Sequence, residues 1–444
     1  MQAKGINERE IILDILLEVE KGEYLAPLIR AVFEKYAYLP KRSRSFIKLV
    51  CEGTLERQYT LDYLIDQVSK VKSKKLKPLI RQLLRMSLYQ LKFMDSPPSR
   101  AIINEAVALA KKRHFNNLAG FVNAVLRRLD ERPALREEDY PDMWTAYSVP
   151  EFVAELLKDK YGEEAARNCL RASLLPPRVF GRVNERLTDR ESLIERLKTE
   201  GALAEAAEGF EDAIELKSYD RIFELESFRE GLFTVQDLSS QLVGLVGAAL
   251  AGERVLDICS APGGKAIHIA QLARESQVLA CDKSEKKKQL IDENIRRCRC
   301  ENINSCVRDA LEFVPEEENA YSLVLADLPC SGLGVMSRKA DIRYRLKKED
   351  IHKLALLQRQ ILDNAVRYVK PGGVLIYSTC TLTREENEEQ YEYLTGTKGL
   401  KPVDFEELLP GSFKGLGAKE GSLQLLNGRD GTDGFYIACF RRES

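Results

Sequence analysis

Histidine is scarce in this chain of 444 residues, where only His114, His268 and His352 are present, far apart in the sequence. A histidine-rich metal site is therefore not expected. Cys298 and Cys300 are close in sequence, but no second close cysteine pair accompanies them, which disfavours a zinc site there as well. We expect a protein without a bound metal.

Long apolar stretches are also missing, and residues 242–250 are among the longest. Because a helix needs roughly 18 apolar residues to cross a bilayer, no membrane association is expected. The first 20 residues interrupt each apolar stretch with a charge and predict no signal peptide. The ten cysteines are then expected to be reduced thiols of a cytoplasmic protein, not a disulfide framework. A monomer is the default expectation.

The chain has almost no net charge, −1 at pH 7, but its charges are unevenly distributed. Residues 1–130 contain 24 basic and 14 acidic side chains, so the rest of the chain holds more acids than bases. A basic N-terminal third is a candidate surface for nucleic acid. Most acids of the remainder, Glu385 and Glu386 among them, are expected to lie on the surface.

Residues 1–130 are predicted to be all helical, since apolar residues recur there at i, i+3 and i+4. Proline or asparagine marks the breaks between the helices, at Pro40, Pro78, Pro97-Pro98 and Asn116-Asn117. Positive charge gathers in four clusters: Lys41-Arg42-Ser43-Arg44, residues 72–77, Lys111-Lys112-Arg113 and Arg127-Arg128. A helical bundle whose lysines only aid solubility is one interpretation, but four clusters in one domain favour contact with phosphates.

Three further regions follow. Residues 131–150 contain three prolines and predict a linker. Residues 151–230 predict a small α+β module with two helices, a strand at 178–184, a helix at 191–201 and strands at 213–217 and 231–237. Residues 231–444 alternate short apolar strands with helices, which is typical of a doubly wound parallel sheet. Its predicted strands are 254–259, 277–282, 303–307, 322–327 and 373–378, followed by a C-terminal β-hairpin.

The turn after the first of these strands, residues 257–265, reads DICSAPGGK and leads into a helix. Ligands of open α/β sheets bind beyond the carboxyl ends of the strands, and the turn has neither the dinucleotide nor the P-loop spacing. Asp282 and Asp309 are predicted to end the second and third strands, where a carboxylate can accept bonds from ribose hydroxyls. Any one of these acids could instead cap a helix. Together they suit a nucleoside-bearing ligand without phosphate, for which S-adenosylmethionine is the obvious candidate.

Two cysteines follow neighbouring strands at the same edge, Cys330 after Asp327 and Cys380 after the next strand. Cytosine C5 is a poor nucleophile until a thiolate adds to C6 and converts the ring to an enamine. That chemistry needs a nucleophilic cysteine, a carboxyl group for the base and help with elimination. Cys380, Asp327 and Cys330 supply these types of group, with Lys265 as a nearby cation.

Three segments make a family resemblance specific. Residues 259–265 (CSAPGGK), 327–345 (DLPCSGLGVMSRKADIRYR) and 371–388 (PGGVLIYSTCTLTREENE) resemble the RNA (cytosine-5) methyltransferases, above all the bacterial 16S (small-subunit) ribosomal RNA methyltransferase B family. The N-terminal helices, with AIINEAVALAKK and FVNAVLRRL, resemble the antitermination factor NusB. PPRVFGRVN and TVQDLSSQL match the family's connecting region, so the resemblance covers essentially the whole chain.

The resemblance implies an all-α NusB-like domain, a small α+β module and a C-terminal α/β Rossmann-like class I methyltransferase domain with a mostly parallel seven-stranded sheet. Cys380 would be the nucleophile and Cys330 would assist product release, with small-subunit ribosomal RNA as partner. The cofactor would be held by Cys259, Ser260, Ala261, Pro262, Gly263, Gly264, Lys265, Asp282, Asp309 and Asp327. Two departures leave every reacting group in place: Ala266 stands where Thr is common, and Leu328 where Ala is common.

Two alternatives stay open. DNA cytosine methyltransferases use the cysteine that follows proline in the loop after strand four, so chemistry alone does not assign the roles of the two cysteines. The same reaction on transfer RNA or DNA is one alternative, because only the resemblance of the helical domain favours ribosomal RNA. An RNA-binding adaptor in transcription, with a vestigial methyltransferase half, is the other.

Overall fold

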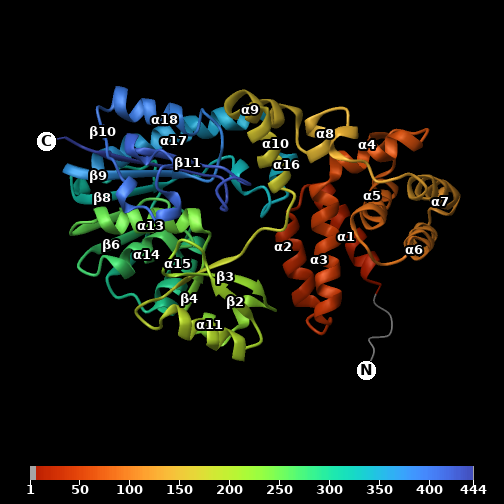
Figure 1. The fold of residues 1–444 in the computed structure, drawn as a ribbon, viewed down its shortest axis with the longest axis horizontal. Coiled ribbons are helices and arrows are strands. Elements are labelled where there is room, and N and C mark those ends of the chain that lie inside the picture. Colours follow the sequence, from red (N-terminus) through yellow and green to blue (C-terminus); the bar gives the residue numbers. More distant parts are fainter. Residues whose placement is uncertain (1–6, 444) are drawn as a thin grey trace. The chain divides into compact units, whose positions relative to one another are not determined.

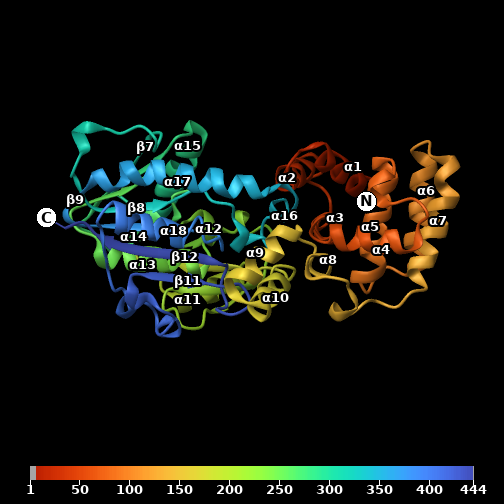
Figure 2. The same cartoon turned by 90° about the horizontal axis from the view of Figure 1, so that it is seen from above.

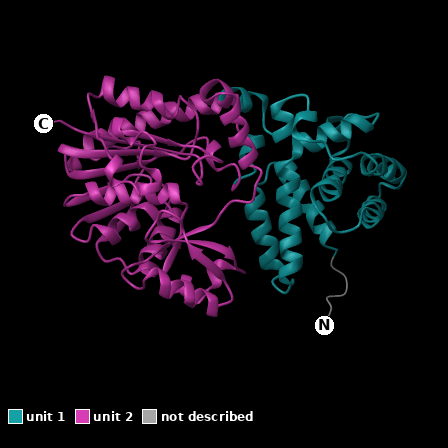
Figure 3. Ribbon diagram, viewed as in Figure 1, with its two compact units in different colours: residues 1–156, 339–345 teal, residues 157–338, 346–444 magenta. Residues whose placement is uncertain are grey.

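The computed structural model describes residues 7–443, and the chain divides into two compact units (Figure 3). The helical unit comprises residues 1–156 and 339–345, and the α/β unit comprises residues 157–338 and 346–444. The chain thus leaves the α/β unit after Arg338 and returns to it at Leu346. No helix within residues 7–443 is both long enough and apolar enough to cross a membrane.

Consecutive helices build the helical unit, as the apolar spacing predicts. Pro40 and Pro98 directly precede two of them and Pro78 begins a third, because proline has no N–H to donate and fits the first turn of a helix. Asn116 begins another, so the predicted breaks are confirmed. The helices are α1 (Glu8–Lys21), α2 (Leu25–Lys35), α3 (Lys41–Glu56), α4 (Gln58–Val68), α5 (Pro78–Phe93), α6 (Ser99–Lys112), α7 (Asn116–Asp130), α8 (Met143–Tyr147) and α16 (Ile342–Arg345).

The 339–345 segment, which includes α16, is part of the helical unit although it follows the Cys330 loop in sequence. Tyr344 donates its hydroxyl to the backbone oxygen of Glu56 at 3.1 Å. The guanidinium of Arg343 is buried and donates to the backbone oxygen of Tyr147 at 3.1 Å. These contacts, far apart in sequence, make the segment an integral piece of the helical core.

The α/β unit begins with an antiparallel four-stranded sheet in the order β2-β3-β1-β4. Its strands are β1 (Phe180–Val183), β2 (Leu203–Ala206), β3 (Ala213–Ser218) and β4 (Phe233–Val235). Helices α11 (Arg190–Thr199) and α12 (Glu226–Arg229) pack with this sheet. Helices α9 (Glu151–Tyr161) and α10 (Glu163–Ala172) precede it in the chain, and the hydroxyl of Tyr161 at the end of α9 donates to the backbone oxygen of Leu382 at 2.9 Å. The expected strands are confirmed, whereas β2 was not predicted. It is a largely exposed edge strand of Leu, Ala and Glu, so no apolar alternation marks it.

The larger sheet has the order β10-β12-β9-β8-β5-β6-β7, with β11 paired to β12. Its strands are β5 (Arg254–Asp257), β6 (Gln277–Asp282), β7 (Ile303–Val307), β8 (Tyr321–Asp327), β9 (Val369–Thr379), β10 (Lys401–Pro402), β11 (Ser422–Leu425) and β12 (Phe435–Arg441). The five strands from β5 to β9 are parallel and β10 to β12 are antiparallel. The predicted mostly parallel sheet and its C-terminal hairpin are confirmed, and the two-residue β10 brings the strands to eight.

Both faces of this sheet are covered, which explains why its strands are continuous apolar runs. Alternate residues such as Val255 and Leu323 pack with α13 and α14, whereas Leu256 and Val324 pack with α17 (Figures 1 and 2). The helices are α13 (Leu238–Leu250), α14 (Gly264–Leu272), α15 (Glu285–Cys298), α17 (Lys348–Tyr368) and α18 (Glu388–Glu392). The chain runs outward from β5 to β7 and then returns to β8 on the other side of β5. The ligand crevice of such a sheet lies at this reversal, beyond the carboxyl ends of β5 and β8.

Candidate active site at the carboxyl ends of the parallel strands

The turn between β5 and α14 presents an open backbone. Asp257 ends β5, and α14 begins at Gly264. Gly263 has φ +98°, a conformation that L side chains rarely adopt. A Cβ on Gly264 would have the Gln236 side chain, at 3.7 Å, as its nearest neighbour. A ligand can therefore approach the main chain of this turn closely.

Carboxylates gather around Cys259 in the same turn. Asp257 is buried, and burial together with the nearby charge of Asp327 raises its pKa to about 7. Asp282, also buried, accepts a hydrogen bond from the backbone N–H of Ser284 at 3.1 Å. Burial raises the pKa of the Cys259 thiol, and the charges of Asp257, Asp327 and Asp282 raise it further. The structure thus brings three predicted acids together at one turn.

Asp309 lies slightly beyond its predicted position. Strand β7 ends at Val307, two residues before Asp309, so the expectation that Asp309 ends this strand is wrong. Its carboxylate accepts the backbone N–H of Leu311 at 3.0 Å and shapes a turn. The preceding residue, Arg308, donates its N–H to the backbone oxygen of Asp282 at 3.1 Å, which keeps the turn next to the end of β6.

Lys265 and Asp327 form an ion pair, with Nζ and Oδ2 2.7 Å apart. The other oxygen of Asp327 accepts the hydroxyl of Ser378 at 2.8 Å. Burial acts to lower the pKa of Lys265, but the charges of Asp327, Asp257 and Cys380 outweigh it, and the pKa is raised. Lys265 is therefore a firmly charged cation within electrostatic reach of Cys380.

The two predicted cysteines are brought together, with the Sγ atoms of Cys330 and Cys380 3.3 Å apart. The hydrogen bond to Cys380 raises the pKa of Cys330 well above its ordinary value, and burial and the charge of Glu386 add to this effect. None of the ten cysteines, all of which lie within residues 7–443, forms a disulfide. One thiol and one potential thiolate thus share a hydrogen bond at the ends of β8 and β9.

Glu386 corrects the expectation that this acid lies on the surface. It is fully buried, whereas its neighbour Glu385 is half-buried. Its carboxylate accepts the backbone N–H of Ser331 at 2.8 Å and the hydroxyl of Thr383 at 2.9 Å. Burial raises its pKa. Polar side chains from distant parts of the chain make this burial possible. The local run of acids does not indicate that these partners are present.

Asn387 was also missed by the sequence analysis. It is fully buried, accepts the hydroxyl of Thr379 at 2.6 Å and donates to the backbone oxygen of Thr381 at 3.1 Å. These bonds lie on either side of Cys380 and fix the turn that carries it. The available signal was the polar stretch 381–388, which lies inside a segment that carries the family resemblance.

The basic clusters of the helical unit differ in their pairing. Lys74, Lys75 and Lys77 are exposed, as expected of a surface for phosphates. In the third predicted cluster, by contrast, Lys112 pairs with Glu10 at 2.6 Å and Arg113 also pairs with acids of α1. Part of this cluster's charge is therefore already compensated.

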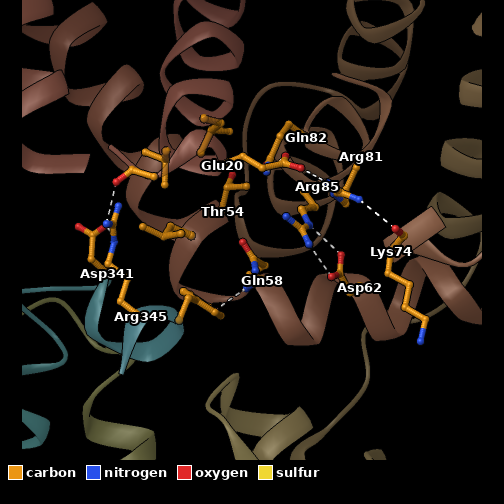
Figure 4. Close-up of a pocket in the computed structure, with 15 residues that line it drawn as sticks. Glu20, Thr54, Gln58, Asp62, Lys74, Arg81, Gln82, Arg85, Asp341 and Arg345 are labelled. Atoms are coloured by element: carbon orange, nitrogen blue, oxygen red, sulfur yellow. Dashed lines mark hydrogen bonds and ion pairs between the residues drawn. The ribbon is translucent and has the colours of Figure 1, made fainter. Parts of the chain in front are cut away.

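A cavity of about 380 Å³ lies inside the helical unit, next to the 339–345 segment (Figure 4). Its arginines are engaged by carboxylates: Arg85 binds Asp62 through two hydrogen bonds of 2.7 and 2.5 Å, and Arg81 pairs with Glu20. Arg345, on the segment itself, pairs with Asp341 at 3.4 Å. Because these cations are compensated, the cavity adds little to the phosphate-binding surface.

The donor set at the sheet edge suits a nucleoside ligand better than a metal. Buried carboxylates such as Asp282 can accept ribose hydroxyls, and the glycine turn leaves backbone groups open. Within residues 7–443, no group of three or more His, Cys, Asp or Glu side chains is placed to hold a metal ion.

Family models cover most of the chain. The NusB family model matches residues 6–131, a ferredoxin-like domain of RsmF/B-like methyltransferases matches residues 149–222, and the 16S rRNA methyltransferase RsmB/F model matches residues 247–441. The last of these matches contains Cys330, Cys380 and the Lys265–Asp327 pair.

Two bacterial relatives match along their whole length. The chain is 35% identical to the probable ribosomal RNA small subunit methyltransferase B of Bacillus subtilis, covering 99% of this chain and 100% of the relative. It is 30% identical to the protein of the same description from Synechocystis, with 98% and 100% covered. The crystal structure of PH0851 has the same fold, with a TM-score of 0.79 and 24% identity over 99% of each chain. The chain belongs to the ribosomal RNA small subunit methyltransferase B family, and its cofactor is S-adenosylmethionine.

Proposed function

We propose that this protein methylates C5 of a cytosine in small-subunit ribosomal RNA through a covalent bond between Cys380 and C6 of the base. The observation that carries the proposal is the 3.3 Å approach of Cys330 and Cys380, next to the Lys265–Asp327 ion pair. An acceptor that is already nucleophilic would need no cysteine at all. Two adjacent cysteines suit an acceptor that must first be activated and then released.

Cys380 is the nucleophile in this proposal. The Lys265 ammonium group favours the thiolate, which is the reactive form of a cysteine. Attack on C6 forms the S–C6 bond, and the electron pair of the C5=C6 bond becomes available at C5. S-adenosylmethionine supplies the electrophilic methyl group when bound.

Asp327 would accept a hydrogen bond from the exocyclic amine of the cytosine and so hold the ring over Cys380. Its carboxylate is already oriented by Lys265 and Ser378, which occupy one oxygen each. Such preorganisation places the reacting groups before the base arrives.

Cys330 completes the reaction by assisting release. Its bond to Cys380 is the main cause of its raised pKa, and that bond weakens once Cys380 is joined to C6. Cys330 can then lose its proton to water and accept the C5 proton. The C5–H electron pair re-forms the C5=C6 double bond, and the S–C6 pair returns to Cys380.

The cofactor would be held by the turn after β5 and by carboxylates of neighbouring strand ends. The residues we assign to it are Cys259, Ser260, Ala261, Pro262, Gly263, Gly264, Lys265, Asp282, Asp309 and Asp327. Residues 1–130 would bind the RNA through their exposed lysines, and a base inside a helix would have to be unstacked before attack.

Two cysteine variants test the proposal with S-adenosylmethionine labelled in its methyl group and small-subunit ribosomal RNA. Cys380→Ala should abolish transfer, whereas Cys330→Ala should trap RNA on the protein as an adduct that survives denaturing electrophoresis. Nucleoside analysis of the wild-type product should find 5-methylcytosine. Normal transfer by Cys380→Ala would contradict the mechanism, and faster methylation of transfer RNA or DNA would contradict the substrate. An adaptor would incorporate no methyl group at all.

A further inference from the structure

Glu386 is a buried carboxylate whose hydrogen bonds all go to the surroundings of the two cysteines. One oxygen accepts the backbone N–H of Ser331 at 2.8 Å and the side-chain amide of Gln358 at 3.2 Å. The other accepts the hydroxyl of Ser331 at 2.5 Å and that of Thr383 at 2.9 Å. Ser331 directly follows Cys330, and Thr383 lies three residues after Cys380.

One side chain therefore joins the loop after β8 to the loop after β9. The hydroxyls of Ser331 and Thr381, 2.6 Å apart, add a second link between the same loops. Gly334 contributes a third, because its N–H donates to the backbone oxygen of Cys380 at 3.0 Å. Of these links, only Glu386 binds both the main chain and the side chain of the residue next to Cys330.

Burying a carboxylate is costly unless several donors compensate for the lost water. Glu386 is fully buried and its four donors provide this compensation, but an apolar side chain could fill the space without the cost. A buried charge tied to the two cysteine loops therefore points to a role in the reaction as well as in the fold.

We propose that Glu386 is a positioning residue that acts through Ser331 to hold Cys330 where it can accept the C5 proton during product release. This inference rests on the proposed function. Bond formation by Cys380 does not require Cys330, so displacement of Cys330 should slow release much more than adduct formation.

The test measures adduct formation and adduct release separately, by quenching single-turnover reactions and separating the RNA–protein adduct on denaturing gels. Glu386→Ala removes the link and should slow release about 30-fold or more while changing formation less than about threefold. Glu386→Gln keeps one oxygen for Ser331 and Gln358, and its amide can donate to the two hydroxyls. It should therefore release the product within about threefold of the wild-type rate.

Glu385→Gln is the matched control, because this neighbouring acid lies outside the link and should leave both rates unchanged. Ser331→Ala keeps the buried carboxylate and removes one of its bonds, so it provides the test if Glu386→Ala does not fold. It should accumulate adduct to a measurable level. Equal slowing of formation and release in folded Glu386→Ala, or wild-type release in Ser331→Ala, would overturn the inference.

The Cys330→Ala variant distinguishes failure of the proposed function from failure of the role proposed for Glu386. If it traps no adduct, the proposed function fails and this inference fails with it. If it traps adduct while Glu386→Ala and Ser331→Ala release product normally, only the role of Glu386 is wrong.

Discussion

The Nζ atom of Lys265 lies 2.7 Å from Oδ2 of Asp327, which joins the first turn of α14 to the end of β8. The cysteine pair lies beside this ion pair, and the charge of Cys380 is one of those that raise the pKa of Lys265. A cation thus lies on the side of Cys380 and an anion, Glu386, on the side of Cys330. This asymmetry supports thiolate chemistry at Cys380 and a protonated resting state at Cys330.

Replacing Lys265 should shift the pH dependence of adduct formation. Lys265→Met removes the cation that favours the Cys380 thiolate, so we expect formation to slow at pH 7 and to recover at higher pH. The half-maximal point should move upward by about one pH unit or more, measured with saturating S-adenosylmethionine. Lys265→Arg keeps the charge and should show a smaller shift. An equal loss at every pH would indicate that Lys265 acts only by binding cofactor.

Asp257 should make stability depend on pH. Its folded-state pKa is raised to about 7 by burial and by Asp327, above the ordinary value of 3.8. The folded protein therefore holds a proton that the unfolded chain loses, and stability falls as pH rises from about 4 to about 7. Asp257→Asn removes this loss. The difference in free energy of unfolding, variant minus wild type, should therefore grow by roughly 2–3 kcal/mol between pH 5 and pH 7.

Urea unfolding at a series of pH values measures this difference, because the other titrating groups cancel between the two proteins. A constant gap between wild type and Asp257→Asn across this range would mean that Asp257 is already ionised in the folded protein.

Tyr344 should stabilise the helical unit although it follows the Cys330 loop in sequence. Its hydroxyl accepts the backbone N–H of Gln58 at 3.0 Å and donates to the backbone oxygen of Glu56 at 3.1 Å. Tyr344→Phe leaves these groups without this partner at a cost of about 1–3 kcal/mol. Backbone hydrogen exchange at residues 57–60 measures this effect and should be faster in the variant than in wild type. Tyr38→Phe, at an exposed tyrosine, is the control and should leave this exchange unchanged. Unchanged exchange in Tyr344→Phe would mean that the 339–345 segment does not stabilise the helical unit.

The sequence predicted the elements whose signals are local. Strands β5 to β9 are short apolar runs because helices cover both faces of the sheet, and the helices of residues 1–130 show their buried stripes. The edge strand β2 has no buried face and left no such pattern. Asp309 was predicted to end the third strand, but the strand ends two residues before it. An acid that follows a strand and an acid that ends one look alike in a sequence.

Long-range polar contacts could not be predicted in the same way. Glu386 looked like a surface acid because the donors that compensate it, among them Ser331 and Gln358, lie 55 and 28 residues away. The 339–345 segment carried a family motif, but no pattern of its own residues indicated that it packs in the helical unit. The motif cysteines were found from the sequence, whereas the residues that position them required the structure.

The lysines of the loop before α5 should carry a measurable share of RNA binding. Changing Lys74, Lys75 and Lys77 to Gln removes three exposed positive charges, so fewer counterions are released when RNA binds. The slope of log Kd against log salt concentration should become shallower by up to about 2–3, and Kd near 0.1 M salt should rise about tenfold or more. Binding of S-adenosylmethionine should be unaffected.

A matched control removes the same number of charges from the α/β unit, at lysines that pair with glutamates: Lys198, Lys217 and Lys414. Because their charge is already compensated, this variant should keep the wild-type salt slope. Equal slopes for both triple variants would show that the basic loop makes no phosphate contacts. A matching loss of cofactor affinity in the first variant would show damage to the fold, because lysines of the helical unit have no reason to act on the turn after β5.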